Sequence, residues 1–106
     1  MIKGAKNAAG WSIDEIDRVV HEPARYLILS ILYVLESGDF LFIQNQSGLT
    51  KGNLSSHVSK LEDAGYVKVV KKFIGKKPLT MLKITTTGRR AFEEYRKTMS
   101  RIIGGK

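Results

Sequence analysis

Hydroxyl, amide and ammonium side chains gather in one short stretch of the sequence, from Thr50 to Lys60. Such groups can hydrogen-bond the edges of nucleic-acid bases and can contact phosphates. The stretch contains no carboxylate, which would repel phosphate groups. The candidate nucleic-acid contacts are Thr50, Lys51, Gly52, Asn53, Ser55, Ser56, His57, Ser59 and Lys60.

These candidate contacts differ in what they can do. Asn53 can hydrogen-bond an adenine edge in bidentate fashion, and Lys51 and Lys60 can reach phosphates or guanine. Gly52 weakens a helix by ~1 kcal/mol relative to alanine, a cost that is explained if another backbone must come close. Two of the residues also have structural alternatives, because Asn53 can bond the local backbone and His57 can hydrogen-bond within the domain or pack against the wing.

Catalysis and metal binding are not indicated by the same stretch. The serines beside His57 have no orienting acid in register, so no nucleophile and base are arranged for covalent chemistry. The chain has no cysteine, and its two histidines show no metal-ligand spacing. The sequence therefore predicts no enzyme activity, no metal site and no cofactor.

The net charge of the 106-residue chain is +8, from 18 Lys and Arg against 10 Asp and Glu, and it is unevenly distributed. Residues 50–90 hold ten bases and two acids, a balance of +8, whereas residues 1–49 sum to −2 and residues 91–106 to +2. A localised excess of this kind indicates a surface that binds a polyanion. The alternative is an ordinary solvated face rich in lysine.

The length of the chain leaves room for one domain. A domain of this size hides about two thirds of its unfolded surface, so pairing with a second copy is a natural way to bury more. The first ten residues lack the apolar core of a secretory leader. The longest apolar run, Tyr26 to Leu35, is far shorter than the roughly 20 residues of a membrane-spanning helix. We therefore expect a cytoplasmic protein that does not enter the membrane.

Helix caps, turn residues and hydrophobic spacing divide the chain into predicted elements. Ser12, Pro23 and Thr50 each mark the start of a helix. The predicted organisation is a flexible N-terminus at 1–11, helices at 12–22 and 23–36, a helix-turn-helix at 40–65, a β-hairpin at 66–84 and a last helix at 86–103. The helix at 23–36 is apolar on every side, so it is either the central helix or partly faces a partner subunit.

Four lysines lie near the tip of the predicted hairpin, and they are Lys71, Lys72, Lys76 and Lys77. Their clustering around Gly75 favours contact with phosphates. The alternative is that they are solvated and only protect a sheet edge from pairing.

Two motifs connect these elements to a known family. The stretch from Gly48 to Val67 reads Leu-Thr-x-Gly-Asn-Leu-Ser-x-His followed by Leu-Glu-x-Ala-Gly-Tyr-Val, and a later stretch, Ile84 to Arg89, leads from the hairpin into the last helix. Over roughly Asp17 to Met99 the chain resembles the small winged helix-turn-helix DNA-binding family of MarR/ArsR-like transcriptional regulators. It departs from that family at the polar pair Gln46-Ser47, where the second helix usually ends on an apolar residue.

The resemblance implies a mainly α fold with a two-stranded β-hairpin wing, in which N- and C-terminal helices pair two subunits. It also implies a homodimer that binds double-stranded DNA at a pseudo-palindromic operator. The helix Thr50 to Ala64, the recognition helix, would enter the major groove and the wing would reach the minor groove or backbone. The apolar residues expected at the dimer interface are Trp11, Ile13, Ile16, Val20, Phe92, Tyr95, Met99 and Ile102.

Other functions remain open at this point. The fold alone does not dictate nucleic-acid binding, so a protein-interaction or scaffold module is one alternative. A protein that binds nucleic acids without sequence preference is another. A small-molecule effector is compatible with the resemblance, and it would have to bind between the long helices at the dimer interface.

Overall fold

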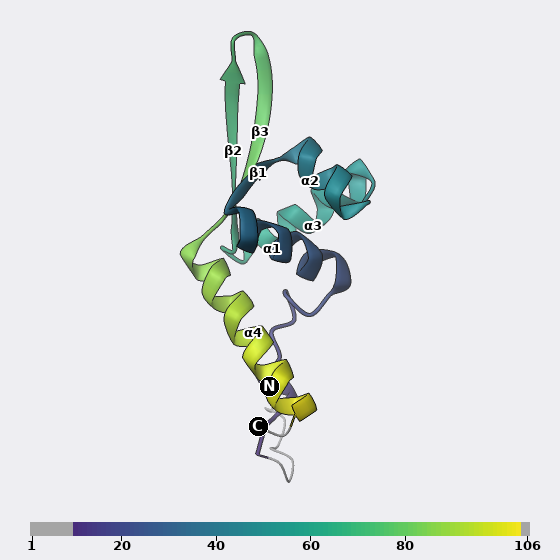
Figure 1. Ribbon diagram of the computed structural model, residues 1–106, viewed down its shortest axis with the longest axis vertical. Coiled ribbons are helices and arrows are strands. Elements are labelled where there is room, and N and C mark those ends of the chain that lie inside the picture. Colours follow the sequence, from purple (N-terminus) through teal and green to yellow (C-terminus); the bar gives the residue numbers. More distant parts are fainter. Residues whose placement is uncertain (1–9, 105–106) are drawn as a thin grey trace.

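The computed structural model describes residues 10–104 (Figure 1). Its elements are a short 3₁₀ helix η1 (Ile13–Glu15), α1 (Pro23–Leu35), β1 (Ser37–Asp39), α2 (Phe40–Ser47), α3 (Lys51–Asp63), β2 (Val67–Ile74), β3 (Lys77–Ile84) and α4 (Thr86–Gly104). Helices α1, α2 and α3 form the body, the β2–β3 hairpin projects from one end, and α4 extends toward the other. This is the predicted winged helix-turn-helix architecture.

Helix α1 lies at the centre of the domain. Pro23 occupies its first turn, and the Glu22 side chain caps it by accepting a hydrogen bond from the Arg25 N–H at 2.8 Å. Ile28, Leu29 and Leu32 are fully buried, and α1 contacts α2, α3, α4 and β3. The structure therefore makes α1 the central helix. Leu27, Val34 and Leu35 stay exposed in the single chain, so a partner on that side of α1 stays a prediction.

Local caps and one turn place α2 and α3. The Asp39 carboxylate accepts from the Phe42 N–H, and Gly48 ends α2 in the left-handed conformation at φ 72°. Thr50 then caps α3 by accepting from the Asn53 N–H at 3.2 Å. The predicted stripe on the inner side of α3 is buried, and it consists of Leu54, Val58 and Leu61. The rest of α3 is thus held at the surface.

The wing is a long antiparallel hairpin. β2 and β3 pair from Val67 with Ile84 out to Ile74 with Lys77. Gly75 has φ 62° whereas Lys76 has no positive φ, a combination that fits the type II′ turn whose twist matches the strands. The sheet has one strand more than the two-stranded hairpin that was predicted. At the base of the wing β1 pairs with β3, which makes a three-stranded sheet in the order β1-β3-β2.

The predicted helix at 12–22 is wrong in the structure, which contains only the three residues of η1. Ser12 and Glu15 form a capping box, but the chain becomes extended at Ile16. The Asp17 carboxylate then accepts from the N–H groups of Val19 and Val20 at 2.8 and 3.1 Å. An acidic side chain that bonds nearby N–H groups competes with helix formation. Residues 1–9 of the expected flexible N-terminus lie outside the described residues.

Helix α4 starts against the base of the wing. The Thr85 hydroxyl accepts from the Gly88 N–H at 2.9 Å and donates to the Gly65 carbonyl. Phe92 and Thr98 are buried on its inner face. Within residues 10–104, no helix combines the length and the apolar character needed to cross a membrane.

Candidate nucleic-acid interface

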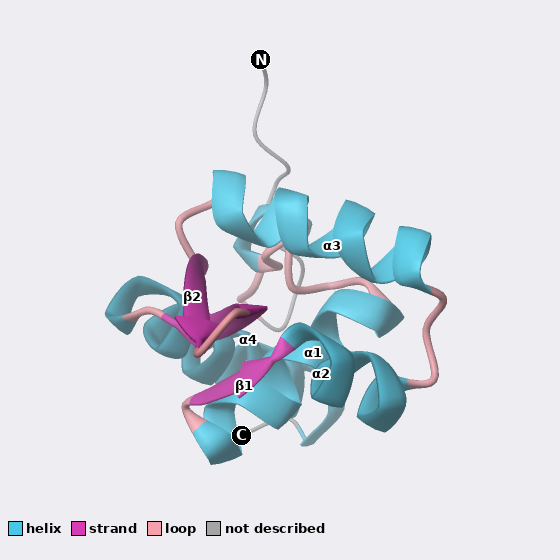
Figure 2. Ribbon diagram, turned by 90° about the horizontal axis from the view of Figure 1, so that it is seen from above, coloured by secondary structure: helices cyan, strands magenta, loops and turns pink. Residues whose placement is uncertain are grey.

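The candidate contacts on α3 are open to solvent. Helix α3 runs along one edge of the helical body (Figure 2). Its buried stripe faces the core, and its other side is exposed. The exposed candidates are Thr50, Lys51, Gly52, Asn53, Ser55, Ser56, Ser59 and Lys60. The acids of this helix, Glu62 and Asp63, lie in its last turn. The exposed face is therefore basic and polar over its first ten residues.

These residues point to two sides of α3. Lys51, Ser55 and Ser59 line a groove of about 300 Å³ between α3 and the β-sheet, together with Glu62. At 100° per residue, Gly52, Asn53, Ser56 and Lys60 face away from the body. The second set therefore faces solvent, and the first set faces the wing.

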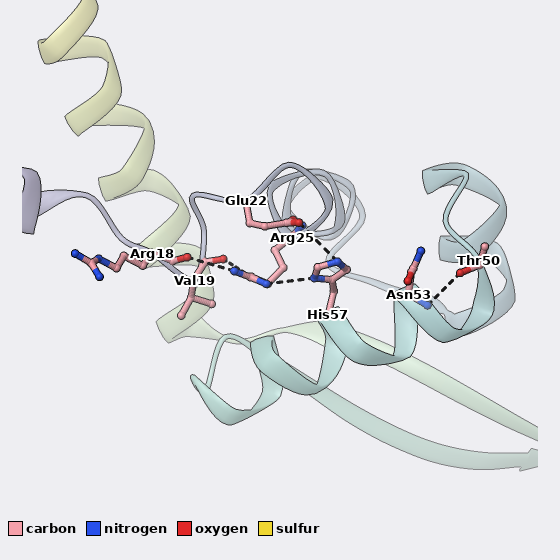
Figure 3. Close-up of polar contacts among 7 residues, drawn as sticks. All are labelled: Arg18, Val19, Glu22, Arg25, Thr50, Asn53 and His57. Carbon is pink, nitrogen blue, oxygen red and sulfur yellow. Dashed lines mark hydrogen bonds and ion pairs between the residues drawn. The ribbon is translucent and has the colours of Figure 1, made fainter.

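Asn53 has a free side chain in the described part of the protein. Its backbone N–H is bonded to the Thr50 hydroxyl (Figure 3), whereas its amide group makes no hydrogen bond to any of residues 10–104. The alternative of an amide bonded to the local backbone therefore does not occur here. All the donor and acceptor capacity of this amide is available to a ligand.

His57 adopts the intradomain role that was considered for it. Its Nδ1 accepts a hydrogen bond from Arg25 Nη1 at 3.2 Å, and its Nε2 lies 3.6 Å from Glu22 Oε2 (Figure 3). Because a guanidinium can only donate, this arrangement assigns the proton of a neutral His57 to Nε2, facing Glu22. The side chain is 21% exposed. His57 thus fixes α3 against the start of α1.

Arg25 is a residue of this site that the sequence reasoning missed. Besides His57, its guanidinium donates to the carbonyl oxygens of Val19 at 2.6 Å and Arg18 at 3.3 Å. Its position in the first turn of α1 was the one signal in the sequence. A cation there interacts unfavourably with the helix dipole, so a specific contact is needed to compensate. Arg25 connects the 18–19 turn, α1 and α3.

The wing carries unpaired positive charge. Lys71, Lys72, Lys76 and Lys77 are all exposed, and every residue from 71 to 78 is exposed on both strands. In the described part of the chain, none of these lysines forms an ion pair. The segment 66–84 contains no acid. Figure 1 shows this half of the hairpin standing clear of the body.

The residues expected at a dimer interface divide into two groups. Val20 and Phe92 are 0% and 3% exposed in the single chain, and the Phe92 ring packs against Tyr26 and Tyr33. The interface prediction is therefore wrong for these two residues. They belong to the core of the single chain, where they pack beside α1. The remaining six are exposed or half-buried, and they are Trp11, Ile13, Ile16, Tyr95, Met99 and Ile102.

Among residues 10–104, no three His, Asp or Glu side chains are close enough to hold a metal ion. The exposed groups of α3 and the wing are instead donors, amides and cations. Their arrangement suits an extended anion that offers acceptors along its length.

Comparison with known proteins gives close and distant matches. The family model of the winged helix DNA-binding domain matches residues 24–103. An uncharacterized protein of Methanocaldococcus jannaschii is 38% identical over 78 residues, which cover 74% of this chain and 85% of that protein.

Solved structures extend these matches. A transcriptional regulator homologue from Pyrococcus horikoshii is 31% identical with a TM-score of 0.79, over 84% of this chain and 88% of that one. A MarR-family transcriptional regulator from Silicibacter pomeroyi shares the fold at 16% identity, with a TM-score of 0.61 over 82% of this chain and 60% of that one. The chain therefore belongs to the winged helix DNA-binding domain family.

Proposed function

We propose that the protein is a sequence-specific transcriptional regulator that binds duplex DNA as a homodimer. In this proposal α3 enters the major groove, and the β2–β3 hairpin lies on the adjacent minor groove or backbone. The observation that carries the proposal is the exposed, acid-free face of α3 between Lys51 and Lys60, on a helix whose inner side is fixed in the core. Membership of a DNA-binding family supports it.

Base reading is assigned to the side of α3 that faces away from the body. Asn53 is the residue there whose planar amide places a donor and an acceptor side by side, so we assign it to an adenine edge. Ser56 and Lys60 supply shorter and longer contacts on the same side. Gly52 has no side chain, so a DNA strand can approach the helix backbone closely at this position. A Cβ there would point into open space, toward the DNA.

The operator should be recoverable by selecting bound fragments from the source genome. We expect a pseudo-palindrome with half-sites ~10 bp apart, bound at least ~10³-fold more tightly than random duplex at equal salt. Fluorescence anisotropy on the selected and random duplexes measures the ratio. Equal affinity for both would reject sequence-specific regulation and leave a general nucleic-acid-binding protein.

Asn53→Ala is expected to relax sequence choice without abolishing DNA binding. Loss of one bidentate contact should remove ~1–3 kcal/mol of discrimination, or about 5- to 150-fold, at one position in each half-site. Affinity for random duplex should change little. Asn45→Ala, an exposed asparagine on α2, is the matched control. Unchanged base preference in the Asn53 variant would assign specificity to other residues.

Dimerisation should be visible in the mass of the free protein. Light scattering at micromolar concentration should give about 24 kDa, twice the 11.9 kDa of one chain. Ile13→Glu is expected to shift this mass to the monomer, because Ile13 is 61% exposed in the single chain and belongs to the proposed interface. Leu41→Glu, at a 63% exposed position on α2 outside the proposed interface, is the control. A monomeric wild type, or dissociation by the control alone, would contradict this interface.

A further inference from the structure

Two large apolar side chains stand at the tip of the wing. Phe73 is 73% exposed and Ile74 is 68% exposed, and they are the last residues of β2 before the turn. Because successive side chains alternate, they lie on opposite faces of the hairpin. Exposed apolar residues on a sheet edge promote aggregation, and proteins usually avoid them. Neither residue belongs to the core cluster of the domain.

The turn holds these side chains at the far end of the molecule. Phe73 pairs with Pro78, and Ile74 pairs with Lys77 across the turn at Gly75. From Val67 to Ile74 the strand rises by ~24 Å, so the tip lies well beyond the core in which Val67 is buried. The hairpin therefore presents a narrow apolar end rather than a broad apolar face.

The positive charge around the tip indicates which kind of molecule binds there. Lys71, Lys72, Lys76 and Lys77 surround Phe73 and Ile74 on both strands. Two such tips would repel each other, which disfavours a second copy of the wing as the partner. A duplex offers two phosphate backbones on either side of an apolar stack of bases, which complements an apolar tip surrounded by ammonium groups.

Groove dimensions limit how the tip can engage. The minor groove of B-DNA is about 6 Å wide, whereas two strands ~4.8 Å apart with their side chains are wider. The hairpin itself therefore stays outside, and only terminal side chains can enter. Apolar side chains that enter the minor groove partly unstack a base step and kink the duplex by about 20–90°.

We propose that Phe73 and Ile74 form an apolar wedge that enters the minor groove next to the recognition helix and opens a base step. This inference rests on the proposed function and adds to it a second source of sequence preference. Flexible pyrimidine–purine steps cost least to open, so the operator should carry a TA or CA step under each wing tip. The lysines supply affinity, and the wedge supplies deformation.

The test uses the full-length protein and a duplex taken from the genomic selection. One duplex carries 2-aminopurine at the step under the wing, and a second carries a fluorophore at each end so that energy transfer reports bending. Wild-type protein should raise 2-aminopurine fluorescence and bend the duplex by at least ~20°. Phe73→Ala with Ile74→Ala should abolish both signals and weaken operator binding about 10-fold or more.

The wedge variant keeps all four wing lysines, so the salt dependence of its binding should equal that of the wild type. Val34→Ala, at an 82% exposed apolar position on α1, should change none of these readouts. The thermal midpoint of the wedge variant should match the wild type, because both side chains lie outside the core.

Three outcomes would overturn the wedge. The wild type could bind its operator specifically without bending it, which rejects the wedge and leaves the proposed function intact. The variant could bend the operator as the wild type does. Binding to vesicles of 30% phosphatidylserine in phosphatidylcholine could depend on Phe73 and Ile74 while duplex bending does not, which assigns the tip to a lipid surface. Absence of any preference over random duplex would instead reject the proposed function itself.

Discussion

Gly88→Ala is expected to destabilise the domain by about 3 kcal/mol or more, enough to lower its melting temperature by roughly 12 °C. A Cβ on Gly88 would lie 2.1 Å from the carbonyl oxygen of Tyr66 and 2.8 Å from its Cα. These are backbone atoms, so no rotation of a side chain can relieve the clash. Thermal unfolding followed by circular dichroism measures the effect.

Tyr66 is also held too firmly to move aside. Its N–H donates to Leu61 at 2.9 Å, its carbonyl accepts from the Thr85 N–H at 3.0 Å, and its hydroxyl donates to Asp17 at 2.5 Å. Burial, together with the hydrogen bond to Asp17, raises the pKa of Tyr66 to about 12, so the hydroxyl keeps its proton to a higher pH than an ordinary tyrosine does. Any shift that admits a Cβ must break some of these contacts.

Gly52→Ala is the matched control for this prediction. It lies in α3, and a Cβ there would meet no atom within 4 Å. Alanine should therefore stabilise this helix by ~0.5–1 kcal/mol. A Gly88→Ala protein that melts with the wild type would show that α4 can shift away from Tyr66 at little cost.

Lys76→Ala with Lys77→Ala is expected to weaken DNA binding about 30-fold at 0.15 M salt, for operator and random duplex alike. Loss of two phosphate contacts should reduce the slope of log K against log salt by ~1.8. If the two proteins bind equally at 1 M salt, this difference in slope corresponds to about 30-fold at 0.15 M. Anisotropy titrations at several salt concentrations measure both quantities.

The control removes two charges elsewhere. Arg96→Ala with Lys97→Ala lowers the net charge from +8 to +6 as well, at exposed positions on α4. The expected loss is small, because interactions between exposed charges are screened beyond ~8 Å at this salt. Equal losses for the two double variants would mean that total charge, rather than the wing, binds the duplex.

Local signals made most of the fold predictable. Asp39, Thr50 and Thr85 are cap residues whose bonds run three residues along the chain, so the sequence carries the information in one place. The buried stripe of α3 follows from helical spacing alone, and with it the outward position of Asn53. The hairpin follows from alternation and from the turn at Gly75.

The features that were missed depend on distant partners. β1 has no apolar pattern and exists because Ser37 to Asp39 pairs with residues more than 40 positions later. Arg25 and His57 are 32 residues apart, so spacing could not reveal their contact. The helix expected at 12–22 failed for a different reason, because Asp17 bonds N–H groups that a helix would have used otherwise. The exposure of Phe73 and Ile74 also depends on how far the hairpin projects from the helices, which the local sequence does not indicate.

The contacts of Arg25 with Val19 and His57 have a consequence for the rotational phase of an operator. The bond to His57 joins α1 to α3 and adds to the apolar packing between them, and the bond to Val19 ties Arg25 to the preceding turn, so α3 is mounted rigidly on the body. In the proposed dimer, the angle between two recognition helices is then fixed by the subunit interface. One base pair inserted between half-sites rotates one of them by ~35° about the DNA axis. A rigidly mounted α3 cannot follow that rotation, and so the protein should measure spacing as strictly as it reads bases.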